Sequence, residues 1–223
     1  MLLQILTYTH HLTTMLFGIF LSAFFLGVKQ NKKNVCILLS GAAVSGLFFL
    51  ICNTVFGSLF TEAVYPIFVH LPLFLLLVFY YRFRWLPSII SIMTAYLCCQ
   101  FSNWAGIFAL SLSGLEWVYY LVRIIVTVAV FAFLSRYLCQ TTALLFAKSD
   151  RELYILGAMP FVYYVFDYST TKFSMLLYSG NKVVVEFLAF AMCISYVIFL
   201  FVYFQEYELK NRACLLYTSD AAD

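Results

Sequence analysis

The sequence predicts an all-α protein: a polytopic transmembrane helical bundle of about seven spans, with its N-terminus outside and its C-terminus in the cytoplasm. Three observations predict this class. The 223 residues are 65% hydrophobic and only 10% charged, whereas a soluble domain is usually about 45–50% apolar and about 25% charged. Apolar runs of about 20 residues, the length that crosses a bilayer, recur along the chain. Lysine and arginine gather in alternate connecting segments, as in cytoplasmic loops.

The first three spans are predicted in the first third of the chain. The first covers residues 6–28, and because its basic residues follow it rather than precede it, it does not resemble a cleavable signal. The second covers residues 35–56 and contains the small-residue stretch SGAAVSG, which is typical of close helix packing. The third covers residues 64–81 and is short; Pro72 permits a kink in it.

The other four spans are predicted at residues 86–110, 117–138, 153–168 and 183–204. The fourth and fifth begin beside Trp85 and Trp117, where the aromatic belts of a membrane protein are expected. The sixth is short, and polar and aromatic residues spaced by three and four predict that its helix continues beyond the membrane. The seventh contains neither glycine nor proline, so we expect it to leave the membrane as an unbroken helix.

The distribution of basic residues predicts the orientation. With the N-terminus outside, most of the 13 lysines and arginines fall on the cytoplasmic side, as the positive-inside rule requires. Those residues are Lys29, Lys32, Lys33, Arg82, Arg84, Arg136, Lys148, Arg151, Lys210 and Arg212. The formal charge of +3 therefore reflects membrane topology, and no nucleic-acid partner is predicted.

The C-terminal residues divide the chain into three parts. We expect residues 1–205 to form one polytopic membrane domain and residues 206–213 to begin a helix in the cytoplasm. Residues 214–223, CLLYTSDAAD, back-translate into consecutive codons of a transposase adapter used in sequencing libraries. We therefore expect a non-native tail, which fold reasoning excludes, and a natural protein that continues beyond about Ala213. A genuine polar tail is the alternative.

Ionisable residues inside the spans are the candidate functional residues, because each costs about 2.5–3.5 kcal/mol to insert. His70, Arg123, Asp167 and Glu186 all fall in the outer halves of their predicted spans, together with the amphipathic ring of Tyr164. We expect them to line a ligand pocket open to the outside. A structural ion pair between Arg123 and Asp167 or Glu186, and a packed, hydrogen-bonded His70, are the alternatives that this pattern leaves open.

The sequence contains no motif of catalysis or metal binding. It has no glycine-rich phosphate loop, no HExxH spacing and no CxxC among its seven cysteines, which we interpret as small apolar residues of the membrane helices. We therefore expect no catalytic residue, no metal and no cofactor in this fragment, and no enzymatic activity of its own.

Three stretches carry a resemblance to a known family. LFTEAVYPIFVHLPLFL, TAYLCCQFSNW and FVYYVFDYSTTKFSMLLYSGNKVVVEFLAF resemble the membrane sensor region of GHKL-type sensor histidine kinases of clostridial and related Gram-positive bacteria, a group that includes quorum-sensing peptide receptors. The resemblance extends over residues 1–213. It implies that the intact parent is a homodimeric, ATP- and Mg-dependent kinase with a cognate response regulator, whose phospho-accepting histidine and ATP-binding domain lie beyond this chain.

The resulting hypothesis is a sensor in the plasma membrane. The fragment would be the multi-pass input domain of a two-component histidine kinase, embedded in the lipid bilayer, binding an extracellular peptide or small molecule and signalling through its last helix. A small multi-span transporter, whose outer-half charges belong to a transport path, is the alternative.

Overall fold

The computed structural model describes residues 2–57, 61, 64–147, 150–172 and 182–220. The described residues are about 90% helical and contain no strand. The elements are α1 (Leu2–Phe25), α2 (Lys32–Phe56), α4 (Tyr65–Phe68), α5 (His70–Leu75), a π-helix η1 (Leu76–Tyr80), α6 (Trp85–Cys98), α7 (Gln100–Ser113), α8 (Glu116–Tyr137), α9 (Cys139–Phe146), α10 (Asp150–Lys172) and α12 (Lys182–Asp220). The prediction of an all-α fold is confirmed.

Four stretches of described helix are long and apolar enough to cross a membrane: Lys32–Phe56, Trp85–Ser113, Glu116–Tyr137 and Leu188–Lys210. Large apolar side chains cover much of the outer surface, among them Val44, Phe79 and Leu112, which are 67%, 73% and 73% exposed. Soluble monomers rarely expose apolar surface on this scale, so the surface suits contact with lipid. The full set of seven spans and their orientation stay predictions.

The third predicted span is interrupted rather than continuous. α4 ends at Phe68, α5 begins at His70, and the helix then widens into η1. Pro72 has no N–H to offer the carbonyl of Phe68, four residues earlier, and this missing bond falls where the helix breaks. Val69, the one residue between α4 and α5, keeps right-handed helical angles, and its carbonyl accepts the N–H of Leu73 at 3.3 Å. The interruption is therefore the kink predicted at this proline, and it places His70 at the start of α5. The fourth predicted span is divided only slightly at Cys99, whose N–H still bonds the carbonyl of Ala95 at 3.2 Å.

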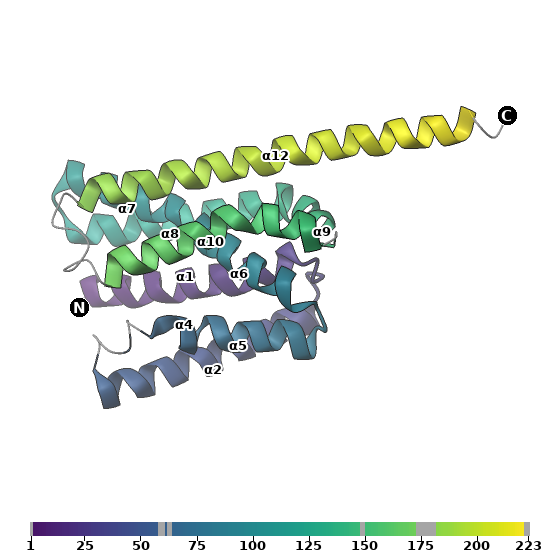
Figure 1. Ribbon diagram of the computed structural model, residues 1–223. Coiled ribbons are helices and arrows are strands. Elements are labelled where there is room, and N and C mark those ends of the chain that lie inside the picture. The colour runs from purple at the N-terminus through teal and green to yellow at the C-terminus, as the bar shows by residue number, and fades with distance from the viewer. Residues whose placement is uncertain (1, 58–60, 62–63, 148–149, 173–181, 221–223) are drawn as a thin grey trace.

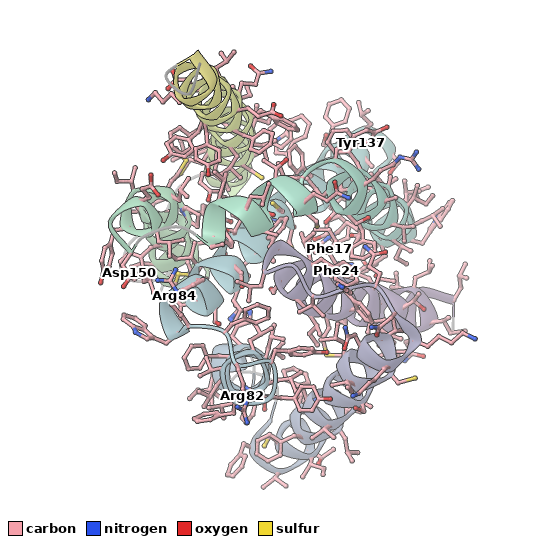
Figure 2. All side chains as sticks on the ribbon, turned by 90° about the vertical axis from the view of Figure 1, so that its right-hand side faces the viewer. Phe17, Phe24, Arg82, Arg84, Tyr137 and Asp150 are labelled. Carbon is pink, nitrogen blue, oxygen red and sulfur yellow. The ribbon has the colours of Figure 1, made fainter. Side chains whose placement is uncertain are left out.

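The centre of the bundle is built on α1, which packs against α8, α6 and α9. Phe17 and Phe24 of α1 both contact the ring of Phe131 on α8, with ring centres 6.1 Å apart in each pair (Figure 2). α10 packs closely on α6 because it carries glycine at the crossing: a Cβ added to Gly157 would lie 2.7 Å from Ile90. Helices α2, α4 and α5 lie on one side of this centre (Figure 1).

α12 is a single helix of 39 residues that lies against α7 and α10 and then extends past the rest of the bundle (Figure 1). Its first part is anchored by aromatic stacking, with the rings of Phe190 and Trp104 only 4.5 Å apart. Its extended part begins at the end of the bundle that carries Arg82 and Arg84. There Arg84 forms an exposed ion pair of 2.7 Å with Asp150 at the start of α10 (Figure 2).

Candidate functional site

Three helices bring together a group of polar side chains. The break before α5 presents His70 at the start of that helix, α6 contributes Tyr96, and α10 contributes Tyr164 and Asp167. Tyr164 and Asp167 are three residues apart, so they share one face of α10. We refer to these four residues as the His70–Asp167 cluster.

Two hydrogen bonds connect the three helices of the cluster. His70 Nδ1 and the hydroxyl of Tyr164 are 2.8 Å apart, which connects α5 to α10. The hydroxyl of Tyr96 donates to Oδ2 of Asp167 at 2.5 Å, which connects α6 to α10. The rings also pack on one another, since the ring of Tyr96 lies 5.0 Å from that of Tyr164 and 5.7 Å from that of His70. Each helix of the group is therefore held by both a polar and an aromatic contact.

The buried carboxylate gives the cluster its chemical character. Asp167 is only 8% exposed, and a buried carboxylate is costly unless donors surround it. Tyr96 supplies one such donor. With three aromatic rings close to the acidic group, the arrangement suits a ligand that carries an ammonium group or hydrogen-bond donors. A ligand that binds the carboxylate of Asp167 competes with the hydroxyl of Tyr96 for it.

The structure unites some of the residues predicted from the sequence and separates others. His70, Tyr164 and Asp167 belong to one cluster. Arg123 does not: its guanidinium bonds Tyr119 on the same helix, and it makes no ion pair with Asp167. Glu186 is in α12, but its side chain lies outside the described residues.

The sequence reasoning missed Tyr96, which supplies a donor to Asp167. Tyr96 is one of 17 tyrosines, and nothing in the apolar run around it distinguishes it from lipid-facing tyrosines. Its position on the face of α6 that packs against α10 is what gives it a role, and that face depends on tertiary packing.

A second missed contact joins α10 to α12. Pro160 has no N–H, so the carbonyl of Leu156, four residues earlier in α10, lacks its regular helical donor. The hydroxyl of Tyr196 on α12 donates to this carbonyl at 2.9 Å, and it also lies 3.5 Å from the hydroxyl of Thr94 on α6. Neighbouring helices commonly satisfy the backbone groups that proline frees in membrane proteins. The signal available in the sequence was a proline inside one predicted span and a tyrosine inside the next. We call this contact the α10–α12 joint.

The described residues contain no group of three or more His, Cys, Asp or Glu side chains that would hold a metal ion. Comparison with known proteins adds no identification: no protein-family model, no curated protein and no solved structure matches the chain.

Proposed function

We propose that the chain is the membrane input domain of a sensor histidine kinase. In this proposal an extracellular peptide or small molecule binds at the His70–Asp167 cluster, and the last helix carries the signal to a kinase domain. The resemblance to GHKL-type sensors suggested the class. The α10–α12 joint is the observation that supports it best.

The joint supports signalling because it connects the candidate ligand site to the helix that leaves the bundle. Tyr164 and Asp167 follow Pro160 in α10, whereas Leu156 precedes it. At 1.5 Å per residue, Asp167 and Leu156 are separated by roughly 16 Å along the helix. A displacement of the outer part of α10 therefore acts on Tyr196, and α12 continues from Tyr196 as one helix to Asp220.

The mechanism requires two arrangements of α10. A ligand that competes for the bonds of Tyr96 and Tyr164 binds better to the arrangement in which those bonds are broken. Its differential affinity shifts the population toward that arrangement. The rotation or tilt of α12 then changes with it, and in the intact homodimer that change reaches the ATP- and Mg-dependent kinase domain and its response regulator.

We propose further that all seven predicted helices cross the plasma membrane, with the N-terminus outside. Two features support this orientation. The connection between α1 and α2, which contains Lys29, and the segment with Arg82 and Arg84 both lie at the end of the bundle from which α12 extends (Figures 1 and 2). Labelling of a cysteine placed at Arg212 with a membrane-impermeant maleimide tests it, since labelling in intact cells would show that this end is outside.

The class is tested by the genomic sequence that follows the codon of Ala213. The proposal requires a helical linker, a phospho-accepting histidine and an ATP-binding domain encoded there. A stop codon, or a domain unrelated to kinases, overturns it.

The joint is tested on the full-length gene product in membrane vesicles supplied with ATP and magnesium. We expect Tyr196→Phe to change the rate of autophosphorylation several-fold and Tyr154→Phe to leave it unchanged. Tyr154 is the matched control because it is a tyrosine of α10 that lies on the surface and is 60% exposed. Equal rates for the two variants would contradict signalling through the joint.

A further inference from the structure

The guanidinium of Arg123 on α8 carries a positive charge that the described protein does not compensate. Its Nη1 donates to the hydroxyl of Tyr119 at 2.5 Å, and its central carbon lies 5.1 Å from the centre of the Tyr119 ring. Its Nε is buried without a hydrogen-bond partner, and no described carboxylate forms an ion pair with it. A charge in this position needs an anionic partner, because transfer out of water is costly.

In the orientation predicted for α8, the guanidinium falls at the level of the lipid head groups. α8 begins at Glu116, and Trp117 and Tyr119 fall in its first turn, where the aromatic belt of a membrane helix is expected. Helical side chains lean toward the N-terminus of their helix. The bond to Tyr119, one turn earlier, shows that Arg123 leans this way. Its charge is therefore directed to the membrane surface, as in other snorkelling arginines.

A glycine on the neighbouring helix holds the arginine in place. A Cβ added to Gly106 of α7 would lie 2.4 Å from Cγ and 2.8 Å from Cδ of Arg123. Any larger residue would collide with the stem of the arginine, so the close approach of α7 fixes the position of the guanidinium.

An apolar groove lies further along α8 than the arginine, toward the C-terminal end of the helix. Thr127 follows one turn later on the same face of α8, and its buried hydroxyl has no hydrogen-bond partner among the described residues. Beyond it lies a groove of about 290 Å³, lined by Phe101, Ala129, Val130, Phe133, Leu134 and Val197. Val130 and Leu134 extend the same helical face, and Phe133 is 50% exposed, so the groove opens toward the bilayer.

We propose that Arg123 binds the phosphate of a phospholipid and that one acyl chain of this lipid occupies the groove. The phosphate accepts hydrogen bonds from the arginine fork, including the Nε–H that is otherwise unsatisfied. The occupant is a lipid of the bilayer because the cation lies at head-group depth and the groove runs from it into the apolar layer. This site is independent of the His70–Asp167 cluster and of the sensing function proposed for it.

The test measures binding of palmitoyl-oleoyl phosphatidylglycerol to the delipidated full chain by native mass spectrometry in a mild detergent. We expect Arg123→Gln to bind the lipid about tenfold more weakly, the ratio produced by loss of a charge-assisted hydrogen bond. Arg136→Gln is the matched control, because it removes the same charge from an exposed position at the other end of α8. We expect it to bind as the unaltered chain does.

Two further variants and one competition experiment keep the test decisive if Arg123→Gln fails to fold. Arg123→Lys keeps the charge but loses the fork, so we expect intermediate affinity. Ala129→Phe leaves the arginine unchanged and fills the exposed side of the groove, so we expect weaker binding of the lipid. Unchanged affinity in either variant contradicts the proposal. Palmitate that displaces the phospholipid at equal concentration also contradicts it, since the occupant would then be a free fatty acid.

Discussion

The α10–α12 joint predicts that the contribution of the Tyr196 hydroxyl to stability depends on Pro160. Tyr196 is 1% exposed, and its hydroxyl donates to the carbonyl of Leu156 at 2.9 Å because Pro160 offers no N–H. Tyr196→Phe removes this donor and changes little else, and it leaves a buried carbonyl unsatisfied. Interhelical hydrogen bonds in membrane proteins contribute about 0.6 kcal/mol on average and up to about 1.7 kcal/mol. Because the regular helical donor of this carbonyl is absent, we expect a loss of about 1 kcal/mol.

The same substitution has a different effect once position 160 can donate. In Pro160→Ala the backbone N–H of residue 160 bonds the carbonyl of Leu156, and the helix satisfies itself. Tyr196→Phe in that background is then expected to cost close to zero. The long contact of 3.5 Å with Thr94 adds little to either value. The double-mutant cycle therefore has an expected interaction energy of about 1 kcal/mol.

The assay is reversible unfolding of the chain in mixed micelles of a mild detergent and sodium dodecyl sulfate, followed by circular dichroism. The free energy of unfolding is measured for the unaltered chain, both single variants and the double variant. Tyr154→Phe, which changes an exposed tyrosine, corrects for any general effect of removing a hydroxyl. If Tyr196→Phe lowers the free energy of unfolding equally in both backgrounds, the reasoning is refuted. The stabilising effect of the hydroxyl would then not depend on the N–H that Pro160 lacks.

Three further predictions concern helix packing and the cluster. Gly106→Ala forces a methyl group against the side chain of Arg123 and should lower the free energy of unfolding by about 1–3 kcal/mol. Gly18→Ala is the control: no atom lies within 4 Å of its added Cβ, so it should raise the free energy of unfolding by about 0.5–1 kcal/mol. The reverse order of the two variants would contradict the packing of α7 on α8. Tyr96→Phe removes a donor from a buried carboxylate and should cost about 1.5–3 kcal/mol in the same unfolding assay, and a neutral result would show that the bond is absent. The side chains of Cys98 on α6 and Cys193 on α12 are both buried in the same core cluster. Oxidation with iodine should join the two thiols and increase mobility on a denaturing gel, except in Cys193→Ser. No shift in the unaltered chain, with iodine present throughout unfolding and refolding in detergent, would contradict the packing of α6 against α12 at this level.

The sequence located helices well because apolar length is a strong local signal. The predicted fourth span at residues 86–110 and fifth span at 117–138 coincide with the apolar stretches Trp85–Ser113 and Glu116–Tyr137. The third span was harder, because its length and composition indicated one helix, whereas the structure has α4, α5 and η1 there. Pro72 indicated a kink, but the size of the break depends on how the segment packs.

The site was predicted in part. Depth along the spans selected His70 and Asp167, which the structure places in one cluster, and it also selected Arg123, which the structure places elsewhere. Depth gives only one coordinate of a residue in a bundle. The direction in which a side chain points around its helix depends on the neighbours of that helix, and a single apolar sequence with little amphipathic contrast does not specify them.

The sequence by itself determined that this is a helical, membrane-type protein with a continuous last helix, because composition, apolar length and the absence of glycine and proline act locally along the chain. Only the tertiary structure decided which polar groups meet. It placed Tyr96 beside Asp167, Tyr196 beside the carbonyl freed by Pro160, and Arg123 over Gly106. The physical reason is that a polar group among apolar helices is satisfied by whichever helix faces it, and that choice is made by packing rather than by order along the chain.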